Sequence, residues 1–160
     1  MFFERSAVGE DRIEHVDGMF YTHGTSLNLM RMVGEMIQTN DDDLSEINPT
    51  RDWKKWKKKQ LSLYYIVLSQ KDEPVACMRF VYDSELVVIE YLFTLPYMRG
   101  RHFGNMLIQF VCDRAPAMNL FVISTEDACA YWISRGFNEE QVSEKLNPYN
   151  DTYLLKKANV

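Results

Sequence analysis

Residues 92–115 read LFTLPYMRGRHFGNMLIQFVCDRA: an apolar segment ends at a proline, a basic turn with two glycines follows, and an apolar-periodic stretch comes next. The first amide groups of a helix lack intrahelical partners and carry a partial positive charge, so they bind anions. Gly100 and Gly104 let the backbone approach such an anion closely, while Arg99 and Arg101 add positive charge. The segment therefore predicts a phosphate-binding turn between a strand and a helix.

Strands and helices alternate on both sides of this turn. Runs rich in β-branched and aromatic residues predict strands over residues 61–69, 75–82, 85–95, 119–124 and 151–157, with a further short edge strand at 2–6. Helical periodicity predicts helices over 24–38, 50–60, 105–114 and 126–134, the last with Gly136 at its C-cap.

Composition is typical of one soluble domain that spans residues 1–160. The chain has a net charge of −5 and is 46% hydrophobic, enough to form a single core. No apolar run is long enough for a membrane helix, and residues 1–5 lack the pattern of a secretory signal, so we expect a cytoplasmic protein. The three cysteines lie far apart among apolar residues, which indicates reduced core thiols and no metal site.

Two sequence blocks resemble the GNAT superfamily of N-acetyltransferases. The block Arg99-Gly100-Arg101-His102-Phe103-Gly104 is similar to the family's acetyl-CoA motif, R/Q-x-x-G-x-G/A, with His102 in place of the middle glycine. The block at 128–137, ACAYWISRGF, is similar to the family's A-x-x-x-Y-x-x-x-G-F. His102 is either a solvent-facing replacement or a second cation over the pyrophosphate.

The resemblance implies an α/β (α+β) GNAT fold: a central mixed, mostly antiparallel sheet of six or seven strands, splayed into a V and flanked by about four helices. Residues 61–157 would form the acetyl-CoA-binding core, and residues 1–60 would shape the acceptor site. Acetyl-CoA would lie in the V, with the amide near Thr94 as an oxyanion donor. The implied cofactor-binding residues are Leu92, Phe93, Thr94, Arg99, Gly100, Arg101, His102, Phe103, Gly104, Asn105, Thr125 and Trp132.

The sequence identifies the general acid and the general base of the implied reaction less clearly than the cofactor-binding residues. Trp132 stands where the family's usual acid is a tyrosine, and an indole cannot supply a proton. Tyr131 is adjacent but about 100° away on a helix. It would either act as the acid after a shift of the helix or pack in the core. Glu90, inside an apolar strand, is the candidate base, because burial makes a carboxylate more basic. Its alternative role is a charge that reaches solvent or pairs with Arg79.

Two charged segments give information about possible binding partners. The segment RDWKKWKKK at 51–59 mixes lysines with tryptophans, yet the acidic chain as a whole would repel nucleic acid, so a solvated helix face is favoured. The acidic run at 41–43 lies in the region that shapes the acceptor site in the family, which suggests a cationic amine. An exposed edge strand would be compatible with a homodimer.

Three functions remain open at this point. The first is transfer of the acetyl group of acetyl-CoA to a primary amine, of a small molecule or a protein, by direct attack in a ternary complex. The second is CoA binding by a GNAT-fold protein with little or no catalysis, because His102, Thr125 and Trp132 depart from the family pattern together. The third is a nucleic-acid or protein interaction module that uses the helix at 51–59.

Overall fold

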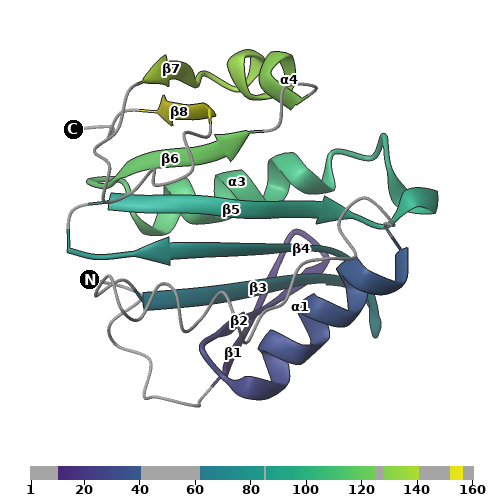
Figure 1. The fold of residues 1–160 in the computed structure, drawn as a ribbon. Helices are drawn as coiled ribbons and strands as arrows, with labels where there is room; N and C mark the ends of the chain where they lie inside the picture. The colour runs from purple at the N-terminus through teal and green to yellow at the C-terminus, as the bar shows by residue number, and fades with distance from the viewer. Residues whose placement is uncertain (1–10, 41–61, 85, 125–127, 141–151, 157–160) are drawn as a thin grey trace.

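The computed structural model describes residues 11–40, 62–84, 86–124, 128–140 and 152–156. Within these ranges the chain forms strands, α-helices and one short 3-10 helix, η3 (Figure 1). No described helix is both long and apolar enough to span a membrane. In chain order the elements are β1 (Asp11–Val16), β2 (Met19–Gly24), α1 (Leu27–Asn40), β3 (Ser62–Gln70), β4 (Glu73–Tyr82), β5 (Leu86–Thr94), η3 (Pro96–Met98), α3 (Phe103–Arg114), β6 (Asn119–Ser124), α4 (Cys129–Ser134), β7 (Asn138–Glu140) and β8 (Thr152–Lys156).

Among the described residues the strands form one eight-stranded mixed sheet in the order β1-β2-β3-β4-β5-β6-β8-β7. Every neighbouring pair is antiparallel except β5 and β6, which are parallel. The hairpin between β1 and β2 turns at Asp17 and Gly18, whose φ angles are 52° and 80°. Positive φ at both central residues gives the turn the twist that a two-residue hairpin needs.

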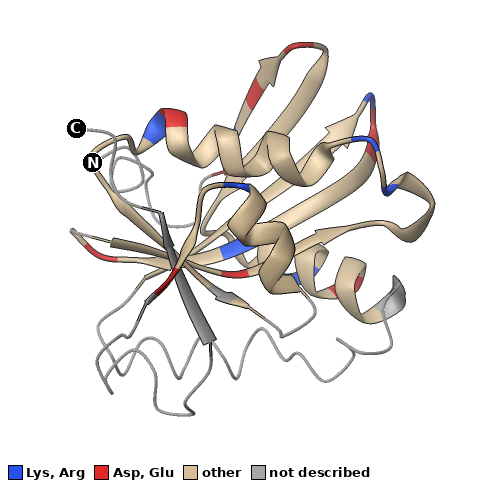
Figure 2. Ribbon diagram, turned by 90° about the horizontal axis from the view of Figure 1, so that it is seen from above, with Lys and Arg blue, Asp and Glu red and all other residues tan. Residues whose placement is uncertain are grey.

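Helices cover both faces of the sheet, α1 on one side and α3 on the other (Figures 1 and 2). Successive strand residues point to opposite faces, so each central strand contributes to two cores. Tyr64 and Ile66 pack on the α3 side, whereas Tyr65 and Val67 pack on the α1 side. This double coverage explains why β3 and β4 are apolar almost throughout.

The parallel strands β5 and β6 are paired over only part of their length. Their register begins at Leu86 and Asn119 and ends at Ile89 and Val122. Beyond Ile89, β5 continues to Thr94 with β4 as its neighbour on one side. The two strands diverge there and open the sheet into a V (Figure 1).

A β-bulge marks the point of divergence. Opposite β4, Tyr91 faces Arg79 and Ile89 faces Phe80, so Glu90 is the extra residue on β5. A bulge bends its strand and increases the local twist, and bulges are common beside active sites. The bulge thus helps to direct the end of β5 away from β6.

A polar cluster ties the β1–β2 hairpin to the C-terminal end of α3. His23 is fully buried, and its Nδ1 and Nε2 lie 2.7 Å from the Tyr64 hydroxyl and 2.7 Å from Oε2 of Glu14. Arg114 donates two hydrogen bonds to the same carboxylate, at 3.0 and 3.1 Å. The Arg114 hydrogen bonds hold the pKa of Glu14 below its ordinary value, whereas burial lowers the pKa of His23. His23 is therefore a neutral donor to an ionised Glu14.

The mixed, mostly antiparallel sheet that the resemblance implied is present and is splayed between β5 and β6, with eight described strands where six or seven were expected. The strands expected from residue 61 onward are all present among the described residues, and β1, β2 and β7 add to them. The first helix begins at Leu27 and not at Gly24, because Gly24 ends β2 and the Ser26 hydroxyl caps the helix by accepting from the Leu29 amide at 3.0 Å. The strand expected at 2–6 and the helix expected at 50–60 lie outside the described residues.

Candidate functional site

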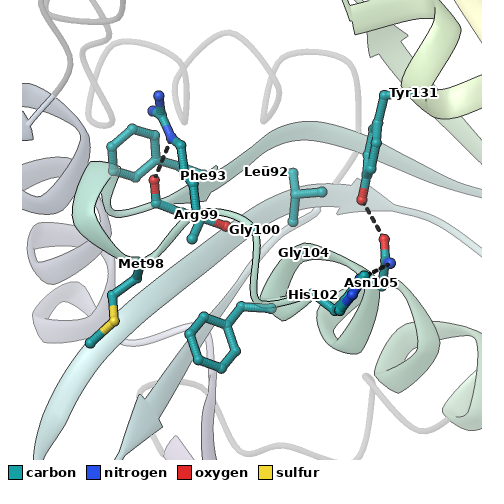
Figure 3. A pocket seen from close by; sticks show the side chains of 11 residues that line it. Leu92, Phe93, Met98, Arg99, Gly100, His102, Gly104, Asn105 and Tyr131 are labelled. Atoms are coloured by element: carbon teal, nitrogen blue, oxygen red, sulfur yellow. Dashed lines mark hydrogen bonds between the residues drawn. The ribbon is translucent and has the colours of Figure 1, made fainter.

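The basic turn after β5 folds back on the strand that precedes it. Pro96 begins η3, and the Met98 amide donates to the Leu95 carbonyl at 2.8 Å. The Arg99 guanidinium donates to the Thr94 carbonyl at 3.2 Å (Figure 3). Gly100 follows with φ of 83°, a conformation that glycine adopts without strain. The turn therefore carries its positive charge at the open end of the V.

Helix α3 begins at this turn without a side-chain cap. His102 is the N-cap residue, with φ of 66°, and it makes no side-chain capping hydrogen bond. The Met106 amide donates to the His102 carbonyl at 3.1 Å, the first bond of the helix. The amides of Phe103, Gly104 and Asn105 precede that bond, so they have no intrahelical acceptor. The charged residues of α3 stand at its C-terminal end, which leaves the positive end of the dipole unopposed (Figure 2).

A cavity of about 520 Å³ lies between the end of β5, this turn and α4. Figure 3 shows side chains from these three parts of the fold around it. Apolar side chains and residues of the basic turn both line it. The lining residues are Leu92, Phe93, Thr94, Met98, Arg99, Gly100, His102, Phe103, Gly104, Asn105 and Tyr131.

Tyr131 reaches into this cavity from α4. Its hydroxyl donates to Oδ1 of Asn105 at 2.7 Å, across the opening of the V (Figure 3). A Cβ at Gly104 would lie 3.2 Å from the same hydroxyl oxygen and 3.4 Å from a Leu92 methyl group. Burial raises the pKa of Tyr131 above its ordinary value, with a smaller opposing effect of Arg135. The phenol is thus protonated at neutral pH and can donate a proton.

The end of α4 explains why Tyr131, and not Trp132, faces the cavity. The Phe137 amide donates to the Trp132 carbonyl at 3.2 Å, and the Gly136 amide donates to the Ile133 carbonyl at 3.0 Å. With Gly136 at φ of 95°, this is a Schellman motif, which brings Trp132 and Phe137 together. Both side chains are buried, and Trp132 lies outside the cavity lining. Trp132, which was expected to contact the cofactor, thus lies in the core, and α4 turns Tyr131 toward the V.

Glu90 pairs with Arg79, which is the alternative to a catalytic role that the sequence left open. Its carboxylate lies 3.2 Å from Nε of Arg79, and the two side chains are 7% and 1% exposed. The Arg79 guanidinium also lies 4.3 Å from the centroid of the Tyr91 ring. Glu90 is the extra residue of the bulge, and its side chain lies in this buried ion pair. It is not among the residues that line the cavity.

Most of the residues expected to bind the cofactor meet around the cavity, with three exceptions. Arg101 is exposed and outside the lining, Trp132 is in the core, and Thr125 lies outside the described residues. Met98 lines the cavity but was missed, because a methionine in a basic turn carries no signal of its own. The bond between Asn105 and Tyr131 was also missed, since the two residues are 26 positions apart.

Comparisons with known proteins agree with this geometry. A family model described as "Acetyltransferase (GNAT) family" matches residues 31–137. No curated protein sequence matches the chain significantly.

Solved structures of acetyltransferases share the fold. An acetyltransferase from Thermus thermophilus aligns with a TM-score of 0.61 at 11% identity, over 94% of this chain and 99% of that one. An acetyltransferase from Streptococcus agalactiae aligns with a TM-score of 0.64 at 12% identity, over 89% and 99%. The PaiA N-acetyltransferase from Thermoplasma acidophilum, in complex with coenzyme A, aligns with a TM-score of 0.53 at 10% identity, over 81% and 90%.

Proposed function

Because the chain belongs to the GNAT family of acetyltransferases, we propose that it transfers the acetyl group of acetyl-CoA to a primary amine. The observation that carries the proposal is the cavity at the opening of the V. It combines an uncapped helix start, a basic turn and the end of β5 beyond its register with β6. An acyl-CoA carries a pyrophosphate, which the helix start and the basic turn can bind. It also carries a pantetheine arm with amide groups, which can hydrogen-bond to the backbone of the strand.

The first turn of α3 would hold the pyrophosphate of the donor. The amides of Phe103, Gly104 and Asn105 supply hydrogen bonds to an anion, and Arg99 supplies charge beside them. The backbone of β5 up to Thr94 would pair with the amides of the pantetheine arm, as an added strand would. The PaiA structure contains coenzyme A, which agrees with a donor of this class.

The reaction would proceed by direct attack. The amine nitrogen attacks the thioester carbonyl carbon, backbone amides near Thr94 stabilise the oxyanion, and the carbon–sulfur bond breaks. The leaving sulfur takes the proton of the Tyr131 hydroxyl, and the phenolate regains a proton from water. The amine nitrogen releases its own proton to water. Tyr131 suits this role because it is protonated and lies in the cavity.

Glu90 is not the base in this scheme. A carboxylate paired with Arg79 is stabilised in its charged form and would lose that pairing on taking a proton. We assign Glu90 to the bulge that opens the V, with water as the proton acceptor. We further propose a cationic acceptor amine, on the basis of the acidic run at 41–43, which lies outside the described residues.

Donor binding tests the first half of the proposal. Acetyl-CoA should raise the melting temperature of the wild-type protein, because a ligand that binds only the folded state stabilises it. Gly104→Glu should abolish the shift, since the new side chain meets Tyr131 and puts negative charge at the anion site. Gln109→Glu adds the same charge at an exposed position of α3 and should keep the shift. No shift in the wild-type protein would refute acetyl-CoA binding.

Measurement of turnover tests the second half of the proposal, the transfer of the acetyl group to an amine. Release of free CoA thiol should be measured over a panel of polyamines, amino acids and peptides with free N-termini. At least one amine should give thiol above background, and Tyr131→Phe should lower kcat by roughly tenfold or more. Binding of acetyl-CoA without turnover of any amine would support the alternative of a CoA-binding protein that has lost catalysis.

A further inference from the structure

We propose that Asn105 is a positioning residue that holds the Tyr131 hydroxyl in the reactive part of the cavity. The inference rests on the proposed function, in which Tyr131 gives its proton to the leaving sulfur. Asn105 stands on the first turn of α3 and Tyr131 on α4, so their hydrogen bond joins two elements that flank the V (Figure 3).

The bond fixes the position of the Tyr131 hydroxyl oxygen relative to α3. The hydroxyl lies 2.7 Å from Oδ1 of Asn105, and a carbonyl oxygen can only accept. Nδ2 of the same amide lies 3.4 Å from Nδ1 of His102, which orients the amide with its oxygen toward Tyr131. The bond therefore holds the hydroxyl oxygen beside Gly104, where a Cβ would lie 3.2 Å from it, and the O–H turns from Asn105 to the leaving sulfur when the proton is transferred.

Nothing in the helix itself requires asparagine at this position. Asparagine is a poor helix former, and the N-cap role that favours it belongs to His102. The contact that uses its amide oxygen is the one to Tyr131. Tyr131 is 37% exposed and its ring also contacts Trp132 and Arg135, so the bond to Asn105 is the polar contact that ties its hydroxyl to α3.

Asn105→Ala and Asn105→Asp separate positioning from a general effect on the fold. We expect Asn105→Ala to lower kcat by roughly tenfold, the value of one hydrogen bond in the transition state, with little change in KM for the amine. Asn105→Asp retains an accepting oxygen, so it should restore most of kcat at saturating acetyl-CoA. Gln109→Ala, on an exposed face of the same helix, should match the wild type.

The titration of Tyr131 supplies a readout that needs no activity. Ultraviolet difference titration of each Asn105 variant against the same variant carrying Tyr131→Phe isolates this one phenol. Asn105→Ala should shift the phenol transition to lower pH, because the protonated form loses its acceptor, and Asn105→Asp should shift it to higher pH by charge repulsion. The Gln109→Ala control should leave it in place.

The outcomes distinguish the two proposals. Opposite shifts in the titration together with loss and rescue of kcat would support the positioning role. An unchanged Tyr131 transition in Asn105→Ala, or equal loss of kcat in the alanine and aspartate variants, would overturn it. If the wild-type protein turned over no amine, the proposed function would fail, whereas the titration would still decide whether Asn105 holds Tyr131.

Discussion

Trp132 and Phe137 pack edge to face, with ring centroids 5.2 Å apart and planes at 75°. Their backbones are joined by the hydrogen bond from the Phe137 amide to the Trp132 carbonyl, at 3.2 Å. The contact fixes the rotation of α4 at its C-terminal end. Since Tyr131 precedes Trp132 by about 100° of helical rotation, burial of the tryptophan turns the tyrosine toward the V.

Restoring the family's tyrosine at position 132 should therefore not improve catalysis. Trp132 is 5% exposed in the core, so Trp132→Tyr would leave a cavity and bury a hydroxyl group. We expect a loss of about 1–3 kcal/mol in the free energy of unfolding and no increase in kcat. Urea denaturation and thiol release would measure the two quantities. A faster enzyme would mean that the side chain at position 132 reaches the leaving sulfur.

The central part of the fold was predictable because its signals are local. The apolar runs of β3, β4 and β5, the glycines of the turn and the periodicity of α3 each specify one element without reference to the rest. The hairpin of β1 and β2 was missed. Its β1 ends the sheet of described strands and has mostly exposed residues, so it lacks an apolar run, although the Asp17-Gly18 pair is a recognised hairpin signal.

Only the part of the site that is formed by backbone groups could be predicted from the sequence. The uncapped start of α3 follows from the glycine-punctuated turn. The position of Tyr131 does not, because α4 has only six residues and its rotation is set by a contact with Phe137 beyond its end. The pairings of Glu90 with Arg79 and of Tyr131 with Asn105 join separate elements, and no spacing rule links such residues.

Gly100 and Gly18 form a matched pair for testing the turn. Both have positive φ, 83° and 80°, and a Cβ at either position would meet nothing within 4 Å. Gly100→Ala and Gly18→Ala should each cost about 1 kcal/mol in stability, since alanine is strained in this conformation. Only Gly100→Ala should weaken acetyl-CoA binding, measured by calorimetry, because only Gly100 lines the cavity. Equal affinities for the two variants would place the donor elsewhere.

His102 occupies a backbone conformation that suits glycine, with φ of 66°. In His102→Gly, relief of backbone strain should offset the greater freedom of the unfolded chain, so stability should change by less than about 1 kcal/mol. His102→Val should cost more than about 1 kcal/mol, because a β-branched residue is poorly tolerated there. Urea denaturation of both variants would measure this.

The same glycine variant separates the two roles considered for the imidazole. If His102 contributes only its backbone to the turn, His102→Gly should bind acetyl-CoA with nearly the affinity of the wild type. A large loss of affinity would instead indicate that the imidazole itself contacts the pyrophosphate.

The buried cluster around His23 should make the protein less stable in acid. The pKa of His23 is lowered by burial from an ordinary value of 6.5, and the pKa of Glu14 is lowered from 4.5, chiefly by hydrogen bonding to Arg114. In both cases the unfolded chain binds protons that the folded chain does not, so stability rises with pH. The free energy of unfolding should therefore fall as the pH drops below about 6.5, where His23 of the unfolded chain is protonated, and fall further below about 4.5 through Glu14.

His23→Gln isolates the first of these two steps. Glutamine keeps a donor and an acceptor near Glu14 and Tyr64 but does not titrate, so the variant should be less stable near neutral pH and show a shallower pH dependence between about pH 7 and pH 5. Urea denaturation at a series of pH values would measure both slopes. Parallel curves for the wild type and the variant would mean that His23 binds its proton equally well in the folded and unfolded chain, and that burial beside Tyr64 does not keep it neutral.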